Sequence, residues 1–390
     1  MTKKRTRAAV LLTAGTLAVG LAACTTPADD AADALGAVDQ GDGTAAARYS
    51  TPLADVCPST VSVQWNWWPQ ADHGWTYQLI GDAGVVDAEK YTYRGPLGST
   101  GIDLEIRAGG PATGGQLPLA QMYSDDSITF GITTTEDSIG GSEEFPTVSV
   151  FTYAVKTPLV FFWGNEDWDF QNLTEVKQSG ETVLAWEGAP YLDVLTSLDL
   201  LNPEQIDASY RGDPARFVLE EGSVLQQGLL TSEVYKYEHD IPAWGKPVEF
   251  VSIGDEYDAY TSQVSIRADQ LEPLRPCLEK LVPLFQQAAV DYAHDPAPTN
   301  AVLLDVVDQL TGSGWELTPG IVEWASTIAV EEGIVANGTD GVFGSFDIDR
   351  VQEYIEIVAP LLSQRGQKVA PGLTADDFVT NEFLDPEITL

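Results

Sequence analysis

The sequence predicts an α/β protein of about two domains, and three observations support this fold class. Short segments in which apolar and polar residues alternate take turns with stretches of helical periodicity, as in sheets flanked by helices. These strand-like segments are dense up to about residue 266 and then stop. The chain has 390 residues, of which 44% are hydrophobic, so it can form two cores of ordinary domain size.

Eight segments have the features of strands. The clearest spans residues 102 to 106, where isoleucine and leucine alternate with acidic side chains. Each segment is bounded by Gly, Pro or acidic residues, which favour turns. In chain order the expected strands are 61–65, 102–106, 127–132, 147–153, 159–163, 182–186, 248–253 and 263–266.

Helices are expected between these strands and after residue 271. Asp213 followed by Pro214 predicts a helix start, because Asp caps helices and Pro is tolerated at the first helical position. Asp347 predicts another start, ahead of an apolar stripe of Ile348, Val351, Ile355, Val358 and Leu362. We expect the chain from Leu271 onward to be almost wholly helical and to pack on sheets made earlier.

The first 24 residues have the build of a secretory signal. A basic start is followed by an apolar stretch at 8–21 that is too short to span a bilayer. The run Leu21-Ala22-Ala23-Cys24 resembles the lipobox of bacterial lipoproteins, which implies cleavage after residue 23 and a diacylglycerol on Cys24. The alternative is an ordinary secretory signal with a chance cysteine.

Residues 24–57 are expected to form a flexible tether, because Ala, Asp, Thr and Gly dominate them and cannot bury enough apolar surface to stay ordered. The tether ends at Cys57, and the third cysteine, Cys277, lies in a helical stretch. An oxidising exterior favours a disulfide between these two, although two free thiols remain an alternative.

Charge and missing motifs exclude several functions. The 59 acidic and 20 basic residues give a formal net charge of −39, and without a basic patch such a surface repels nucleic acids. No phosphate-binding glycine loop, Gly-x-Ser-x-Gly elbow, paired metal-binding histidines or Cys-x-x-Cys is present. The turn at 337–341 has the composition of a calcium loop without its ligand spacing. We therefore expect a protein that is not an enzyme and has no cofactor or metal.

Three tryptophans crowd the end of the first expected strand: Trp65, Trp67 and Trp68. Ligands of open α/β sheets collect at the carboxyl ends of strands, so this loop is a candidate site. Each ring alone could belong to the core. Three within four residues cannot all face one side of a strand, so at least one should point into a loop or cleft.

Several short motifs, in order, resemble the solute-binding proteins of ABC importers, in the nitrate, sulfonate, taurine and thiamine-pyrimidine class. The similarity runs from about residue 60 to 300 and more loosely to the end. It is carried by Val-Ser-Val-Gln-Trp-Asn-Trp-Trp-Pro at 61–69, Gly-Gly-Pro at 109–111, Ile-Thr-Phe-Gly-Ile at 128–132, Lys-Thr-Pro at 156–158, Gln-Gln-Gly-Leu-Leu-Thr-Ser-Glu-Val-Tyr at 226–235, Gly-Ser-Phe-Asp at 344–347 and Phe-Leu-Asp at 383–385.

The resemblance implies a two-lobed periplasmic binding protein type 2 fold, with the ligand buried between lobes that close on it. The first lobe would comprise residues 58–153 and 257–390, and the second lobe 154–256. The chain would work as a monomer on the outer face of the bacterial cytoplasmic membrane, held by lipid, with an ABC permease and ATPase as partners.

The resemblance also implies ligand-binding positions. The first-lobe wall would hold Trp65, Trp67, Trp68, His73, Thr133, Thr134, Thr135 and Glu136. The second-lobe wall would hold Trp186, Glu187, Gly188, Thr231, Ser232 and Glu233, with Tyr257 and Tyr260 near the return hinge. Alternatives stay open: the threonines could only cap a helix, Glu233 could be an exposed carboxylate, and Gly188 could serve a backbone turn.

These walls contain no Lys or Arg, whereas an anion needs positive charge or several oriented donors. Indole rings, hydroxyls and the carboxylates of Glu136, Glu187 and Glu233 favour a neutral or cationic flat heterocycle, such as a pyrimidine precursor of thiamine. Alternatives are a receptor for sulfonate, taurine or nitrate, a sensor subunit, and a pyrimidine-synthase-like enzyme that uses lysine-bound pyridoxal phosphate and a cysteine cluster. The chain lacks that cluster.

Overall fold

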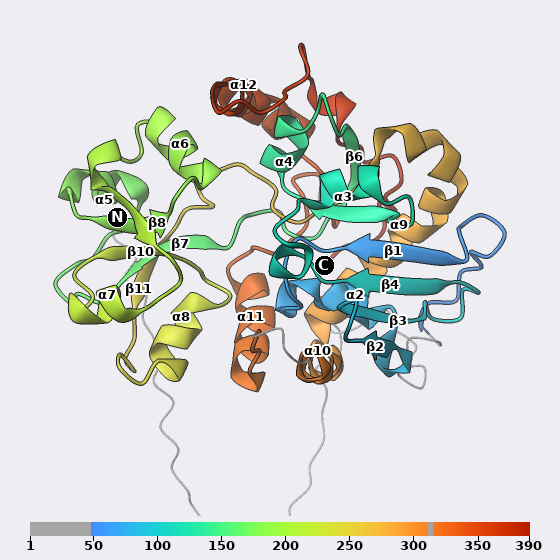
Figure 1. Ribbon diagram of the computed structural model, residues 1–390, viewed down its shortest axis with the longest axis horizontal. Coiled ribbons are helices and arrows are strands. Elements are labelled where there is room, and N and C mark those ends of the chain that lie inside the picture. Colours follow the sequence, from blue (N-terminus) through green and yellow to red (C-terminus); the bar gives the residue numbers. More distant parts are fainter. Residues whose placement is uncertain (1–47, 311–314) are drawn as a thin grey trace, which may run out of the picture. The chain divides into compact units, whose positions relative to one another are not determined.

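The computed structural model describes residues 48–310 and 315–390, whose elements Figure 1 traces along the chain. The expected signal peptide at 1–23, the lipidation site Cys24 and most of the expected tether lie outside these residues. Within the described ranges, no helix combines the length and apolar character needed to cross a bilayer.

The first of two mixed sheets has seven strands in the order β2-β3-β4-β1-β5-β12-β6. Strand β1 pairs in parallel with β4 and β5, so the carboxyl ends of these three strands meet at one edge. The return strand β12 lies antiparallel between β5 and β6. The strands are β1 (Thr60–Gln64), β2 (Val85–Asp87), β3 (Thr92–Pro96), β4 (Asp103–Arg107), β5 (Phe130–Thr133), β6 (Thr147–Thr152) and β12 (Gln263–Arg267).

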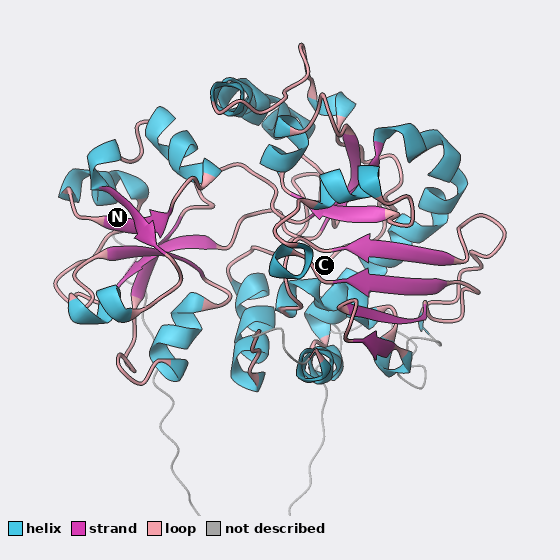
Figure 2. Cartoon of the chain, in the orientation of Figure 1, coloured by secondary structure: helices cyan, strands magenta, loops and turns pink. Residues whose placement is uncertain are grey.

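The second sheet has five strands in the order β11-β7-β10-β8-β9. Strand β10 runs parallel to β8 and antiparallel to β7. The strands are β7 (Leu159–Trp163), β8 (Val183–Trp186), β9 (Ile206–Tyr210), β10 (Leu225–Leu229) and β11 (Glu249–Ser252). The chain therefore crosses between the sheets twice, at 153–158 and at 253–262; Figure 2 shows both sheets with their helices. We call the parts built on the two sheets the first and second lobes.

Helices surround each sheet. Helix α9 packs on α2 and β6, whereas α12 contacts α4 of the first lobe and α6 of the second. The bounds are α2 (Gly74–Gln78), α3 (Pro118–Ser124), α4 (Thr135–Gly140), α5 (Leu173–Ser179), α6 (Pro190–Ser197), α7 (Ala215–Leu219), α8 (Glu233–Tyr235), α9 (Leu271–His294), α10 (Ala297–Gln309), α11 (Pro319–Glu331) and α12 (Ile348–Gln364).

The two expected helix starts differ in outcome. Asp347 caps α12 as predicted, with its Oδ1 accepting a hydrogen bond from the Arg350 amide at 3.1 Å. Asp213 accepts from the amide of Ala215 at 2.7 Å, but α7 begins at Ala215, so Pro214 precedes the first helical residue. The prediction for α7 was therefore wrong by one residue.

The core of the first sheet holds satisfied hydroxyl groups beside its apolar side chains. Every residue of β6 is buried. The Ser149 and Ser265 hydroxyls lie 2.8 Å apart, and Ser265 also bonds to the Thr133 hydroxyl at 2.7 Å. Because each buried hydroxyl has a partner, these polar groups carry little of the penalty of burial and fix the β5-β12-β6 pairing.

The end of the chain departs from the helical expectation. Helix α12 ends at Gln364, and the residues after it form a loop with one short 3-10 turn at Ala375–Asp377. Gly366 has φ +84°, a conformation that glycine adopts without strain, and a proline follows at 371. This loop packs against the first sheet, where Val379 bridges to Ser149 of β6.

The expected tether also ends earlier than residue 57. Tyr49 and Leu53 are fully buried, and the Tyr49 hydroxyl donates to Asp291 of α9 at 2.8 Å. These buried side chains and the hydrogen bond from the Leu53 amide to the Thr100 carbonyl hold this segment, which we call the strap (residues 48–57), on the first lobe. Cys57 at the end of the strap forms a disulfide with Cys277 of α9, across 220 residues.

Removing the disulfide should destabilise the first lobe. The loss of a native disulfide typically costs about 2–5 kcal/mol, because the unfolded chain gains freedom. We expect the Cys57→Ser/Cys277→Ser variant to melt roughly 5–15 °C below the wild type. Thermal unfolding followed by circular dichroism measures this difference. The wild type under reductant should approach the variant, and equal melting temperatures without reductant would contradict the prediction.

Candidate ligand-binding site

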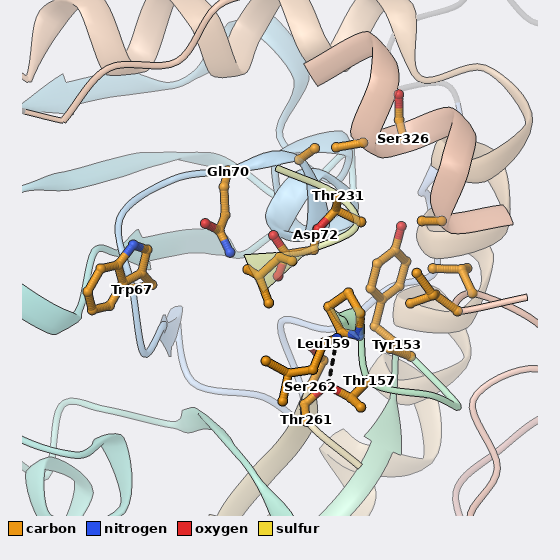
Figure 3. A pocket seen from close by; sticks show the side chains of 18 of the residues that line it. Trp67, Gln70, Asp72, Tyr153, Thr157, Leu159, Thr231, Thr261, Ser262 and Ser326 are labelled. Atoms are coloured by element: carbon orange, nitrogen blue, oxygen red, sulfur yellow. Dashed lines mark hydrogen bonds between the residues drawn. The ribbon is translucent and has the colours of Figure 1, made fainter. Parts of the chain in front are cut away.

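A cavity of about 350 Å³, the interlobe cavity, lies where the two crossing segments pass between the sheets (Figure 3). Its walls come from the loop after β1, the start of α4, both crossing segments, the end of β10 and helix α11. The volume is at the lower end of the range of small-molecule sites. The cavity therefore suits a ligand of modest size that touches both lobes.

Three of the predicted residues line this cavity: Trp67, Thr134 and Thr231. Trp67 is the tryptophan of the cluster that faces outward, and it is 42% exposed. Its loop packs closely on the loop after β4, where the Gly109 amide donates to the Trp67 carbonyl at 2.9 Å. A Cβ at Gly109 would lie 1.9 Å from the Trp65 carbonyl oxygen, so only glycine fits there.

Trp65, Trp68 and His73 lie in the core instead of on the cavity wall. Trp65 stacks on His73 with ring centroids 3.6 Å apart, and Trp68 packs edge-on against Tyr91. Burial lowers the pKa of His73 well below its usual value, so the ring is neutral. Within the described ranges, His73 Nε2 has no hydrogen-bond partner. These three side chains are buried beside Trp67 in the sequence and support the loop that carries it.

The three threonines at the end of β5 have different roles. Thr134 both lines the cavity and caps α4, its hydroxyl accepting from the Asp137 amide at 3.1 Å. Thr133 is fully buried in the first sheet. The Thr135 hydroxyl accepts from the amide of Tyr260 at 2.9 Å, which attaches the return hinge to the start of α4.

Glu136 and Tyr257 form a buried hub away from the cavity. The hydroxyls of Tyr257 and Tyr354 both donate to Glu136 Oε1, joining the return crossing segment, α12 and α4. Burial, the largest cause, raises the pKa of Glu136 to about 7, although the bond from Tyr354 opposes this shift. The carboxyl expected to receive a ligand thus serves the packing of three elements.

The second-lobe predictions also fall mostly outside the cavity. Trp186 is 44% exposed at the end of β8, and Glu187 pairs with Arg211 at 3.0 Å on the surface. Gly188 has φ +77°, and its carbonyl accepts from Arg365 at 2.8 Å. This backbone conformation fits the alternative in which Gly188 serves a backbone turn.

Glu233 positions the cavity wall without lining it. Its Oε2 accepts from the amide of Leu229 at 2.8 Å, which fixes the end of β10, where Leu229 and Thr231 face the cavity. Ser232 lines a smaller cavity of about 30 Å³ that adjoins the first. The two cavities share Thr231 and residues of the loop after β1.

Sequence reasoning missed three polar wall residues, Gln70, Asp72 and Tyr153, which project toward the cavity in Figure 3. Asp72 belongs to the 3-10 turn at Ala71–His73 that follows β1, so the signal was an acidic residue in the first turn after the tryptophan loop. Its side chain is 39% exposed, yet burial raises its pKa to about 6, while the Gln70 side chain and a backbone amide oppose the shift.

The interlobe cavity has an acidic character. Among the described residues that line it, Asp72 is the one ionisable carboxyl, and none is Lys, Arg or His. Hydroxyl and amide groups share the walls with leucine, alanine, valine and isoleucine side chains. The described residues also contain no cluster of three or more His, Cys, Asp or Glu that could hold a metal ion.

Comparison with solved structures identifies the fold. The periplasmic aliphatic sulphonate binding protein from Escherichia coli has 14% sequence identity and a TM-score of 0.51, over 80% of this chain and 90% of that one. The alkanesulfonate-binding protein from Xanthomonas axonopodis pv. citri, bound to MOPS, has 13% identity and a TM-score of 0.50, over 83% of this chain and 98% of that one. A scan against protein-family models and a search of curated proteins find no match.

These similarities show that the chain has the two-lobed α/β fold of the periplasmic binding proteins of ABC importers. At such identities they do not carry the sulfonate specificity across.

Replacing Glu136 should change how stability depends on pH. A carboxyl with a folded pKa of about 7, above the ordinary 4.5, stabilises the fold fully below pH 4.5 and loses this contribution as pH rises through 7. Glu136→Gln keeps an acceptor for both tyrosines without the charge. We expect the variant to exceed the wild type in unfolding free energy above pH 7, by on the order of 2 kcal/mol, and to match it near pH 4.

Chemical denaturation at several pH values between 4 and 8 measures this difference. A variant that is less stable than the wild type at pH 8 would show that the hub prefers the ionised carboxylate and would contradict the prediction.

Proposed function

We propose that this protein is an extracytoplasmic solute-binding protein, anchored by lipid on Cys24, that captures a flat nitrogen-containing heterocycle and delivers it to an ABC permease. The fold and the cavity between its lobes support the class of function. The charge of the cavity supports the class of ligand. A pyrimidine precursor of thiamine is the proposed example.

The single observation that carries this ligand class is the absence of Lys and Arg from the described cavity walls. A buried sulfonate or nitrate keeps its charge and requires cations or several oriented donors. Here the one charged wall group is the carboxyl of Asp72, which would repel an anion. The solved relatives are named for sulfonates, so this chain is proposed to use the same fold for a different ligand.

The ring of Trp67 and the polar groups around it suit a flat heterocycle. The indole of Trp67 is 42% exposed and offers an aromatic ring for stacking. The hydroxyls of Thr134, Thr231 and Tyr153, with the amide of Gln70, can donate to ring nitrogens or accept from amino groups. The carboxylates of Glu136, Glu187 and Glu233 lie outside the cavity lining, so the acidic group that faces a ligand is Asp72.

Release to a permease requires the lobes to open. We propose lobe boundaries at 58–153, 154–256 and 257–390, with the crossing segments as hinges. Several contacts also link the lobes outside these segments: Trp324 of α11 donates to the Leu230 carbonyl at 2.8 Å, and Arg365 donates to the Gly188 carbonyl and pairs with Asp193 of α6. A ligand that touches both walls favours the closed state, and the permease can recognise that state.

Enzymatic and sensory roles are the alternatives. A pyrimidine synthase that uses pyridoxal phosphate needs a lysine in its site, and the described walls of the interlobe cavity contain none. We therefore propose that the protein is not an enzyme. A sensor subunit would bind the same ligand, and transport assays in cells that lack the permease separate the two roles.

Binding should depend on Trp67. With the non-lipidated Cys24→Ser chain, a calorimetric screen of pyrimidines, purines, taurine, alkanesulfonates and nitrate should find binding with a heterocycle. Trp67→Ala should then weaken that binding by about 10- to 100-fold, because a stacked ring is lost. Trp186→Ala is the matched control, since Trp186 is equally exposed but lies outside the cavity lining.

Equal losses in the two tryptophan variants would contradict the site, and binding of sulfonate or nitrate alone would contradict the ligand class.

Lipid anchoring is tested separately. If a diacylglycerol on Cys24 holds the protein, Cys24→Ser should move it from the membrane fraction to the soluble extracytoplasmic fraction. Fractionation and immunoblotting measure the change, with Cys57→Ser as the control cysteine variant. Retention of Cys24→Ser in the membrane fraction would disprove this anchor.

A further inference from the structure

We propose that Asp72 makes the interlobe cavity selective for a positively charged ligand, so that the captured heterocycle carries a protonated or quaternary nitrogen that pairs with this carboxylate. This inference rests on the proposed function and adds the charge of its ligand. It assigns to Asp72 the role of a specificity-determining residue.

The carboxylate of Asp72 faces the cavity without a cationic partner. In the described part of the chain, no Lys or Arg nitrogen lies within 4.0 Å of it, and the basic side chain within that distance is His73, with Nε2 3.8 Å from Asp72 Oδ2. Because burial keeps His73 neutral, this contact is not an ion pair. A carboxylate held in such a place gains most from a cation that a ligand brings.

Asp72 also lines the smaller cavity, together with Lys236 and Glu316. In the described part of the chain, no ion pair within 4.0 Å joins Lys236 to Asp72. The Lys236 ammonium lies 5.7 Å from the centroid of the Trp315 ring. The interlobe cavity is left with the charge of Asp72, in a protein whose formal net charge of −39 also attracts cations at long range.

The groups around Asp72 prepare it to accept a cation. Burial raises its pKa to about 6, so it is mostly ionised at neutral pH, at an energetic cost that a bound cation would relieve. The Gln70 side chain lines the same wall and opposes this rise in the pKa of Asp72, so it favours the charged form. Trp67 lines another side of the cavity in Figure 3 and supplies an aromatic ring that can contact the same cationic heterocycle.

Matched ligand pairs test the inference, since the two members of each pair differ in charge and hardly in shape. One pair is 4-amino-5-aminomethyl-2-methylpyrimidine, a cation at neutral pH, and its neutral 5-hydroxymethyl counterpart. The second pair is benzamidinium and benzamide. Calorimetry on the full Cys24→Ser chain at pH 7.5 should show at least tenfold tighter binding of the cation in at least one pair.

Asp72→Asn should remove this preference. We expect the variant to lose at least about 30-fold in affinity for the cation and to keep its affinity for the neutral partner within about threefold. The control is Asp308→Asn, which removes one negative charge from an exposed position of α10 and should leave both affinities unchanged.

The outcomes separate the two proposals. If neutral members bind as tightly as cations, or if Asp72→Asn keeps the cation preference, the role of Asp72 is overturned and a heterocycle receptor still stands. If neither member of either pair binds and sulfonates do, the proposed ligand class fails and this inference fails with it.

A measurement without ligand gives a second test. Since the ionised Asp72 is costly above pH 6, Asp72→Asn should raise the melting temperature at pH 8, and the difference should shrink as pH falls to 5. Burial raises the pKa of the facing Tyr153 and Tyr292 and lowers that of His73, so none of them changes charge in this window. Lys236 and Glu316 of the smaller cavity are unchanged between the variant and the wild type, so they are common to both melting curves.

A lower melting temperature for the variant at pH 8 would show that the carboxylate already has its partners, and it would overturn the inference.

Discussion

The site depends on the pairing of β6 with β12. Thr152 and Gln263 lie opposite each other in this antiparallel pair, and just beyond them the Tyr153 amide donates to the Ser262 carbonyl at 3.1 Å. Both crossing segments therefore leave the first sheet at one place and run side by side toward the second. Tyr153 and Ser262 line the cavity because of this pairing, and both walls are positioned relative to it.

The fold was predictable where segments are apolar on both faces. Strand β7, Leu159–Trp163, matches the expected range because its run of large apolar residues has no helical periodicity. Strand β9, Ile206–Tyr210, was missed because a short edge strand with mostly partly exposed residues has no such run. Strand β10, Leu225–Leu229, was also missed, because it carries two glutamines and a glycine. Its burial comes from the strands and helices packed around it and not from its own composition.

The site was less predictable, and two acidic residues show why. Asp72 and Glu136 both lie in the first turn of a helix that follows a strand of the first sheet, β1 for Asp72 and β5 for Glu136. Glu136 is enclosed because Tyr257 and Tyr354, more than 120 residues further along the chain, close over it. Asp72 remains open to the cavity. No local pattern distinguishes the two positions, since the difference comes from elements that meet only in the folded chain.

The strap has a mechanical consequence. A pull on the chain ahead of Tyr49 is resisted by the Tyr49 contact with Asp291 and then by the covalent link from Cys57 to Cys277, both of which transfer force into α9. Strand β1 begins at Thr60, after this link. Tension from the proposed lipid anchor would thus enter the first lobe through α9, ahead of the strand that leads to the tryptophan loop.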